Sequence, residues 1–334
     1  MKDGTAKEDV MRPCSRRDFV KQASAGATTT LLSGYLPGVA DSVLQNTAPN
    51  VQFSTEPRER ISVSSYPFRE YITGKHDAGA RDEMSAAVAK MPLKHFAAHI
   101  STKFNIHKVE PWSEHFLSLE ASYLDEIREA AAKSGSSFAN VAADGENSLY
   151  SSDVAECDRA IQFAKTWIDV AAHIGSPSVR INIAAARNTK PEVSRVVEGL
   201  KPIADHAAAK NIAVHLENDN PDSEDPFFIV NVLQHAGSAW IRALPDFGNS
   251  LAALPPEDAY RGIDEMFAHA YAISHVKDTT TTPAKRVVEV DLERIFTLAK
   301  KHNYKGVFSM EWETAGDVYA GTSKLIAITL KNLT

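Results

Sequence analysis

Residues 214–219 read "VHLEND", a short apolar run that passes into acidic groups. Val214 and Leu216 are typical of a strand in a covered sheet. Glu217 is not, because an ionised carboxylate without a partner is costly to bury. A group from another part of the fold must therefore compensate Glu217, and the rest of the sequence indicates where that group comes from.

A regular alternation extends from this stretch in both directions. From residue 61 onward, short runs rich in strand-forming residues alternate with longer amphipathic segments. In the segment 151–175 the apolar residues have helical spacing, Ser152 or Asp153 can cap the start, and Gly175 can close the end. We expect eight strands, over residues 61–66, 106–112, 138–144, 178–183, 212–217, 241–247, 272–277 and 306–311.

Eight strand-then-helix units in one run predict an α/β fold, a (β/α)8 TIM barrel over residues 61–334. A doubly wound open sheet is the alternative. No G-x-G-x-x-G motif follows the first predicted strand, which counts against a dinucleotide-binding version of that sheet. The apolar fraction of 43% in 334 residues provides enough material for one large core.

The charge of the chain bears on its partners. The formal net charge is −7, so the protein is not an obvious electrostatic partner for nucleic acid or for an anionic membrane surface. We therefore expect a small-molecule ligand, no nucleic-acid partner and no stable membrane anchor. The composition leaves the oligomeric state open.

The N-terminus carries a targeting signal. Residues 15–21, "SRRDFVK", resemble the twin-arginine export motif, with Arg16 and Arg17 as the pair. The apolar stretch that follows is too short and too rich in Gly and Thr to span a membrane, and it ends in small residues. We expect a signal peptide over residues 1–40, a linker over 41–60, and export to the periplasm or beyond through the twin-arginine translocase.

Chemistry in a TIM barrel sits at the carboxyl ends of the strands. Four consecutive predicted strands each end near a group that can bind a metal: Glu217, then Asp246 in "PDFGN", His275 in "SHVKD" and Glu311 in "SMEWE". Three carboxylates and one imidazole suit one divalent ion, Mn²⁺, Co²⁺ or Mg²⁺, with Zn²⁺ as a further candidate. A shared metal is our prediction for the group that compensates Glu217. The alternative is four independent polar groups, each bonded to loop amides.

The ordered set "HLEN", "PDFGN", "SHVKD" and "SMEWE" resembles the sugar phosphate isomerase/epimerase family of xylose isomerase-like TIM barrels, including its members with a twin-arginine signal. The segments "KFNIHKVEPW" (103–112) and "SPSVRIN" (176–182) are similar to that family's second and fourth strands. The resemblance implies one divalent metal held by Glu217, Asp246, His275 and Glu311.

The chain departs from the family pattern at two positions. Ketose epimerases of the family carry a histidine where this sequence has Asn249, which cannot act as an acid or base near neutral pH. The family's arginine after the metal histidine has no clear match, since Thr281 is near that place. Lys277 or Lys285 is the candidate to replace it. The resemblance therefore carries over the metal site but not the identity of the substrate.

Further side chains near strand ends are candidates for substrate binding. We predict that role for Asn249, Lys277, Glu110, Arg180 and Trp112. Glu110 and Asp144 can each bind a sugar hydroxyl or cap a loop, and an inward Arg180 needs a partner such as Glu217 or Glu110. His215 is expected to be a hydrogen-bonded core histidine rather than a second-metal ligand. The aromatic residues that lie near strand ends and could pack on a sugar ring are Tyr66, Trp112, Phe247 and Trp312.

These observations predict an enzyme, a divalent-metal-dependent sugar isomerase or epimerase. Glu217 and Glu311 are the expected catalytic bases, which move a proton through an enediolate of a keto-sugar or a related carbohydrate. A lyase that acts on keto-glycosides by β-elimination is the first alternative. An endonuclease IV-like nuclease and a non-catalytic sugar-binding protein are the others, and the acidic chain and the export signal count against the nuclease.

The export signal can be tested directly. Replacing Arg16 and Arg17 together by lysine should leave the protein in the cytoplasm, because the translocase recognises the arginine pair. Cell fractionation and immunoblotting measure this outcome. Normal accumulation of the double variant in the periplasm would contradict the assignment.

Overall fold

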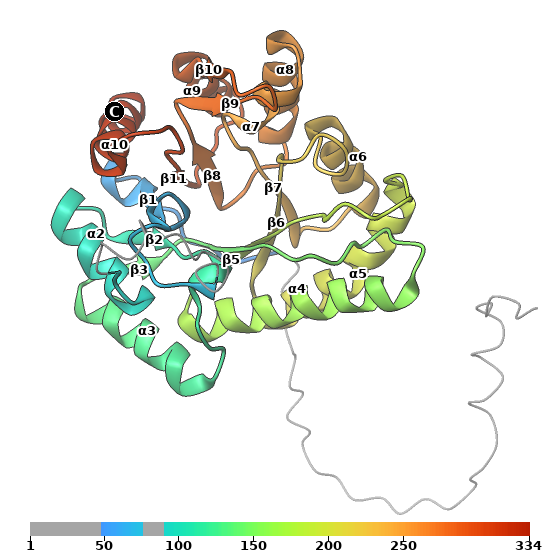
Figure 1. Ribbon diagram of the computed structural model, residues 1–334, viewed down its shortest axis with the longest axis horizontal. Coiled ribbons are helices and arrows are strands. Elements are labelled where there is room, and N and C mark those ends of the chain that lie inside the picture. The colour runs from blue at the N-terminus through green and yellow to red at the C-terminus, as the bar shows by residue number, and fades with distance from the viewer. Residues whose placement is uncertain (1–47, 76–89) are drawn as a thin grey trace, which may run out of the picture. The chain divides into compact units, whose positions relative to one another are not determined.

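Parallel strands surround a central core, and helices cover their outer side (Figure 1). A computed structural model of the protein describes residues 48–75 and 90–334, so the predicted signal peptide and the first part of the predicted linker lie outside the described residues. The barrel strands are β1 (Ile61–Ser64), β2 (Lys108–Glu110), β3 (Ser137–Phe138), β4 (Val141–Ala143), β5 (Ser178–Ile181), β6 (Ala213–Glu217), β7 (Ile241–Leu244), β8 (Ile273–Val276) and β11 (Val307–Met310).

The predicted (β/α)8 barrel is confirmed. Each expected strand range contains an observed strand, and the range 138–144 contains the end of β3 and the whole of β4. The strands form two parallel sheets, with the orders β3-β2-β1-β11-β8 and β4-β5-β6-β7. Single bridges, Trp112 with Ala142 and Asp246 with His275, join the sheets at both seams. The alternative of a doubly wound open sheet is wrong, because β11 pairs with β1 and the ring is closed.

The helices follow the strands in the expected order. In α4 the Asp153 side chain accepts a hydrogen bond from the amide of Ala155, and Gly175 ends the helix at φ 81°. Both predicted helix boundaries are therefore confirmed, since a left-handed C-terminal residue favours glycine. The helices are α2 (Phe96–Phe104), α3 (Ala121–Lys133), α4 (Val154–Ile174), α5 (Val193–Lys210), α6 (Pro226–Ala236), α7 (Asn249–Ala253), α8 (Pro256–Phe267), α9 (Leu292–Lys301) and α10 (Val318–Leu333).

Most of the barrel strands are buried on both faces. Every residue of β1, β5, β6, β8 and β11 is buried, as expected where side chains fill the barrel on one side and helices cover the other. A polar residue within these strands is therefore costly to bury unless it finds a hydrogen-bonding or charged partner inside the protein.

The described part of the predicted linker contacts the barrel domain. Residues 57–60 form a short 3₁₀ helix, Pro57–Arg60. Before it, the carbonyl of Pro49 accepts a hydrogen bond of 2.6 Å from the Tyr271 hydroxyl, and Phe53 packs edge-on against the Tyr271 ring. This segment is thus attached at Tyr271, immediately before β8.

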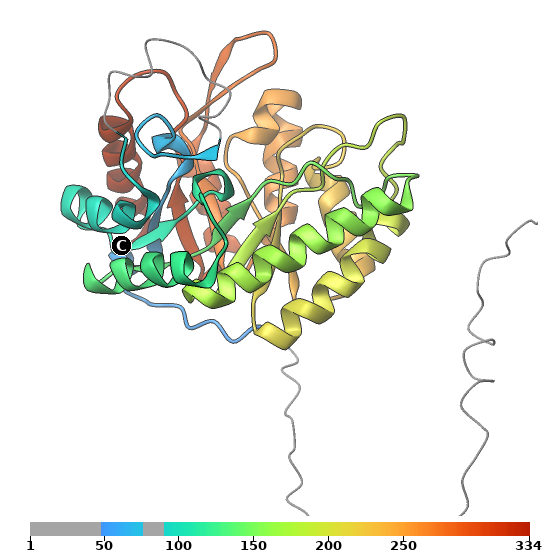
Figure 2. The ribbon, with the colours of Figure 1, turned by 60° about the horizontal axis from the view of Figure 1, so that its bottom comes forward.

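An antiparallel hairpin follows β8 and does not belong to the barrel. It consists of β9 (Thr279–Thr281) and β10 (Val287–Glu289) and rises from the rim at which the strands end (Figure 2). Gly248, which precedes α7, lets the hairpin approach: a Cβ there would lie 3.3 Å from the Lys277 Cβ and 3.4 Å from the Thr280 Cβ. The hairpin is therefore packed against the barrel rim.

Among the helices of residues 48–75 and 90–334, none combines the length and the apolar character that a membrane span requires.

Candidate functional site

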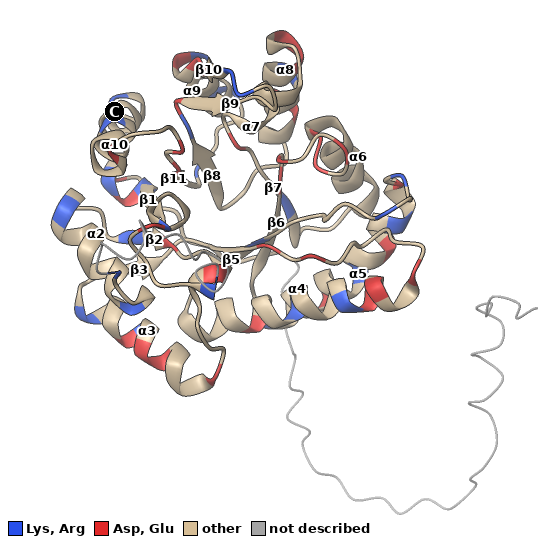
Figure 3. Cartoon of the chain, in the orientation of Figure 1, with Lys and Arg blue, Asp and Glu red and all other residues tan. Residues whose placement is uncertain are grey.

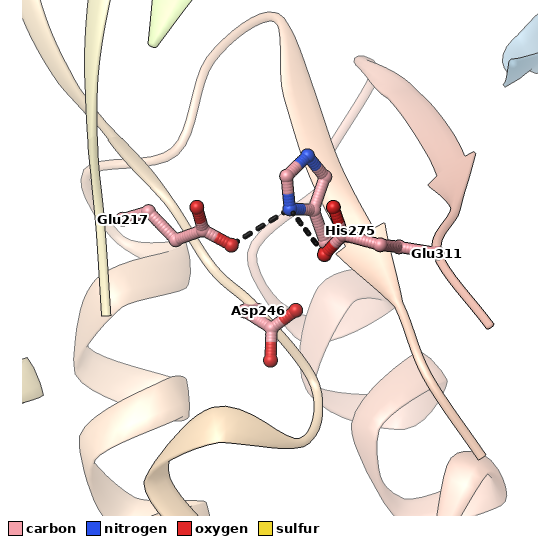
Figure 4. A group of neighbouring side chains, drawn as sticks. All are labelled: Glu217, Asp246, His275 and Glu311. Atoms are coloured by element: carbon pink, nitrogen blue, oxygen red, sulfur yellow. Dashed lines mark hydrogen bonds and ion pairs between the residues drawn. The ribbon is translucent and has the colours of Figure 1, made fainter. Parts of the chain in front are cut away.

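Four side chains converge at the rim of the barrel (Figure 4). Glu217 ends β6, Asp246 follows β7, His275 lies in β8 and Glu311 follows β11. Each offers one ligand-capable atom, and these atoms all lie within 4.8 Å of one another. All four residues are at most 5% exposed. The fold thus brings together the whole set that the strand ends predicted.

The donor atoms of this cluster fit a divalent ion. His275 Nδ1 lies 2.7 Å from Glu217 Oε1 and 3.1 Å from Glu311 Oε2. Asp246 Oδ1 accepts hydrogen bonds from the amides of Gly248 and Asn249. Its other oxygen, Oδ2, is buried and has no hydrogen-bond partner among residues 48–75 and 90–334, and the Lys277 Nζ lies 3.5 Å from it. A buried carboxylate oxygen without a hydrogen bond, beside an imidazole and two further carboxylates, belongs to the donor set that hard and borderline divalent ions prefer.

The protein's own cations balance this cluster. Burial alone would lower the pKa of His275, but Glu110, Glu217 and Glu311 outweigh burial and hold that pKa well above its usual range. Burial raises the pKa of Asp246 to about 7, because the nearby Lys277 offsets only part of the effect of burial. A cation at Asp246 Oδ2 would favour the ionised carboxylate. Acidic residues also occur along the outer helices (Figure 3), so their burial, not their number, distinguishes the cluster.

Lys277 and Asn249 meet at the edge of the cluster. The Lys277 Nζ lies 3.1 Å from Glu311 Oε2 and 2.7 Å from Glu313 Oε2, and it donates a hydrogen bond of 2.9 Å to Asn249 Oδ1. Lys277 is 3% exposed. Of the two lysines expected to replace the missing arginine, Lys277 is therefore the one that reaches the cluster.

Arg180 pairs with two carboxylates, Glu217 and Asp144. Its Nε is 3.0 Å from Glu217 Oε2, and its Nη1 pairs with Asp144. The expected pairing of Arg180 with Glu217 is thus present. Trp112 contacts the same Asp144: its Nε1 donates a hydrogen bond to Asp144 Oδ2, and its ring packs edge-on against Tyr66.

Glu110 lies deeper than its position in the sequence suggested. It is 0% exposed, and both of its carboxylate oxygens lie 3.0 Å from His275 Nε2. The residue was expected to bind a sugar hydroxyl or to cap a loop. Its described contacts instead place it behind the histidine, on the side away from Glu217 and Glu311.

Two other expected residues belong to the interior. His215 is fully buried, accepts a hydrogen bond from the Ala272 amide, and has a pKa lowered to about 3 by burial, so it is a neutral core histidine. Phe247 is 0% exposed and packs against Phe296 and Phe308 rather than facing solvent.

A polar cavity of about 250 Å³ lies above the cluster. Glu110 and Trp112 are not among the described residues that line it. Sequence reasoning missed Asp219 as a lining residue, although Asp219 follows Glu217 by two positions and alternation could have indicated it. The lining residues are Tyr66, Asp144, Arg180, Asn182, Glu217, Asp219, Asn249, Lys277, Glu311 and Glu313.

Comparison with known protein families is consistent with this site. The model of the xylose isomerase-like TIM barrel family matches residues 97–330. The chain belongs to this family. Comparison with curated proteins gives no significant sequence match.

Several solved structures share the fold at low sequence identity. A xylose isomerase-like TIM barrel protein from Mycobacterium smegmatis, in complex with magnesium, is 18% identical, with a TM-score of 0.58 over 73% of this chain and 90% of that one. A D-allulose 3-epimerase from Methylomonas sp. is 12% identical, with a TM-score of 0.61 over 82% and 97%. The 3-keto-D-glucoside 4-epimerase of E. coli is 11% identical, with a TM-score of 0.59 over 81% and 98%.

The cluster makes a testable prediction about metal content. We expect the purified protein to hold about one divalent ion per chain. The His275→Ala variant should lose most of the bound metal, because the imidazole donor of the cluster is gone. Elemental analysis after gel filtration measures the ion, and circular dichroism checks the fold. His235→Ala, at an exposed position on α6, is the matched control. His275→Phe, which keeps a ring but has no donor atom, serves if the alanine variant unfolds, and wild-type metal content in a folded variant would show the ligand set to be wrong.

Proposed function

We propose that the protein is a divalent-metal-dependent sugar isomerase or epimerase, which removes a proton beside a carbonyl group and returns it through an enediolate. The observation that carries the proposal is the convergence of Glu217, Asp246, His275 and Glu311 within 4.8 Å, with Glu217 and Glu311 in the lining of a polar cavity. Membership of the xylose isomerase-like family supports it. Some structural neighbours are named as sugar epimerases, which agrees with it.

The four residues of the cluster would hold the ion, which we expect to be Mn²⁺, Co²⁺ or Mg²⁺, with Zn²⁺ as a further candidate. When bound, a divalent ion polarises a carbonyl oxygen and stabilises the negative charge that develops on proton removal. The protein's own side chains would bind the substrate and transfer the proton.

Glu217 and Glu311 are the proposed bases. Both line the cavity, and they approach His275 Nδ1 from opposite sides (Figure 4). One carboxylate takes the proton from the substrate carbon. If the other returns a proton to the opposite face of that carbon, the centre is inverted; return to the neighbouring carbon gives an isomer. Arg180 contacts Glu217 at 3.0 Å and Lys277 contacts Glu311 at 3.1 Å, and each cation so keeps its carboxylate oriented.

The same proton removal permits a second outcome. If a group on the β carbon departs with its bonding electrons, the enzyme is a keto-glycoside lyase. The Lys277 ammonium group lies at the cavity wall, and it could assist this outcome by exchanging its hydrogen bond to Asn249 for one to the departing oxygen. Product analysis separates the two: an isomerase or epimerase conserves the mass of its substrate, whereas a lyase releases an alcohol or a sugar.

We place either reaction outside the cytoplasm, as the twin-arginine motif predicts.

Solvent exchange tests the proposal. With Mn²⁺ in heavy water, the wild-type protein should incorporate deuterium next to the carbonyl of its keto-sugar substrate, as mass spectrometry and NMR can measure. Glu217→Gln and Glu311→Gln keep an oxygen for the metal but remove the base, so each should lose at least about 10²-fold in rate while retaining metal.

The two variants should also differ from each other. The one that lacks the returning acid should still exchange the substrate proton without turning substrate over, and the other should do neither. Glu265→Gln, an exposed position on α8, controls for the loss of one carboxylate. Near wild-type turnover by both site variants, with metal bound, would exclude both carboxylates as bases and direct attention to Glu313 and Lys277.

A further inference from the structure

The mouth of the barrel contains two adjoining cavities. The inner one, of about 250 Å³, is lined by Glu217 and Glu311 of the metal-ligand cluster. The outer one, of about 510 Å³, lies toward the β9–β10 hairpin. The two share four lining residues, Tyr66, Asp219, Asn249 and Glu313, which form a collar between them.

The walls of the outer cavity are held in place by the surrounding structure. On one side they are formed by the hairpin, from Thr279 to Thr281 together with Lys285. The hydroxyl of Thr279 hydrogen-bonds to that of Thr314, and Thr280 packs beside Gly248. On the other side, the Arg69 guanidinium stacks on the Tyr66 ring at 4.5 Å and donates to the Tyr66 carbonyl. Ala252 of α7 completes the lining.

The chemistry of the outer cavity suits a polyhydroxylated ligand. Threonine hydroxyls and the Asn249 amide offer both donors and acceptors. The carboxylate of Glu313 is paired with Lys277, whereas Asp219 adds an exposed carboxylate that can accept hydrogen bonds from sugar hydroxyls. Ligand sites commonly measure about 300–1,000 Å³, and the inner cavity alone is smaller than that range. A ligand larger than one sugar ring would therefore have to extend through the collar into the outer cavity.

We propose that the outer cavity is a subsite for a second sugar ring or another polyhydroxylated group, so that the substrate is a glycoside rather than a free monosaccharide. This inference rests on the proposed function, because it assumes that the reacting ring binds at the cluster. The β9–β10 hairpin then acts as a specificity element that contacts the part of the substrate that does not react.

Filling the outer cavity tests the inference. Ala252→Phe adds volume there without removing a hydrogen-bonding group, whereas Ala253→Phe places the same ring at the exposed neighbouring position of α7. The probes are a keto-sugar and its glycoside with a second hexose. Wild-type protein should bind the glycoside at least about 10-fold more tightly, which corresponds to one or two net hydrogen bonds. Ala252→Phe should abolish that preference and Ala253→Phe should retain it.

Calorimetric binding tests the outer subsite, and deuterium exchange separately tests the proposed function. Equal affinity of wild-type protein for the two sugars, or an undiminished preference in Ala252→Phe, would overturn the subsite even if exchange occurs. A glycoside preference that Ala252→Phe abolishes would support the subsite even if neither sugar exchanges deuterium, and the proposed function alone would then have failed.

A second, independent inference comes from the hydrogen bonds behind His275. Both oxygens of Glu110 lie 3.0 Å from His275 Nε2. The Asn140 side-chain amide donates to Glu110 Oε1 at 2.7 Å, and the Ser178 hydroxyl donates to Asn140 Oδ1 at 2.7 Å. All of these residues are buried, at 0% exposure. A continuous polar chain therefore leads from β5 to the histidine.

This chain fixes which nitrogen of His275 is available to a metal. The Nδ1 atom faces Glu217 and Glu311, and the Nε2 atom faces Glu110. A neutral imidazole can offer its Nδ1 lone pair only when the proton is on Nε2, and a carboxylate acceptor at Nε2 favours that tautomer. We infer that Glu110 is a positioning residue, which orients His275 toward the metal and does not contact the substrate.

Metal affinity tests this role without any substrate. Glu110→Gln keeps an acceptor oxygen but loses the charge, so its Kd for Mn²⁺ should rise about 10–100-fold by calorimetry. Glu110→Leu, which keeps most of the volume but offers no acceptor, should bind more weakly still, and the difference between the two variants would show that the acceptor, and not only the packing, matters. Glu120→Gln, an exposed carboxylate before α3, should bind as the wild type does.

If removal of Glu110 prevents folding, Asn140→Ala provides a second route, because it withdraws the amide that holds Glu110 and leaves Glu110 itself in place. Its Kd for Mn²⁺ should also rise. Wild-type affinity in a folded Glu110→Gln or Asn140→Ala protein would overturn the inference.

Discussion

The compensation of buried carboxylates is the constraint on which the site depends. Glu110, Glu217, Asp246 and Glu311 are all buried at the same end of the barrel. An unpaired buried charge costs several kcal/mol, so each needs a cation or a set of donors within reach. His275, Lys277 and Arg180 supply these contacts, and each of the three touches at least two carboxylates. The positions of these cations therefore determine the geometry of the whole site.

The barrel and its cluster could be predicted because both follow from local patterns. Each strand has its own apolar run, and in parallel strands of a closed ring the residues at the carboxyl ends face the same rim. Glu217, Asp246, His275 and Glu311 could be found by looking at the ends of four consecutive runs. The pairing of Arg180 with Glu217 could be anticipated because a buried guanidinium requires a carboxylate.

The remaining features depend on the relative heights of neighbouring strands, which no single segment encodes. Glu110 and Glu217 both close strands, but the stagger places Glu110 behind His275 and Glu217 in front of it. Trp112 is likewise turned toward Asp144 by a hydrogen bond that forms only once β2 and β4 are adjacent. The position of the β9–β10 hairpin could not be read from its run of threonines, because it packs closely against Gly248, which is distant in the sequence.

The seam between β7 and β8 gives the cluster a further significance. One sheet, through β6 and β7, carries Glu217 and Asp246, and the other, through β8 and β11, carries His275 and Glu311. Across this seam the Phe247 amide bonds to the His275 carbonyl, and the His275 amide bonds to the Pro245 carbonyl. An ion held by all four side chains would link the two sheets across a seam that these hydrogen bonds already close. Local opening of the seam would then cost more with the ion bound, and those two amide protons would exchange more slowly.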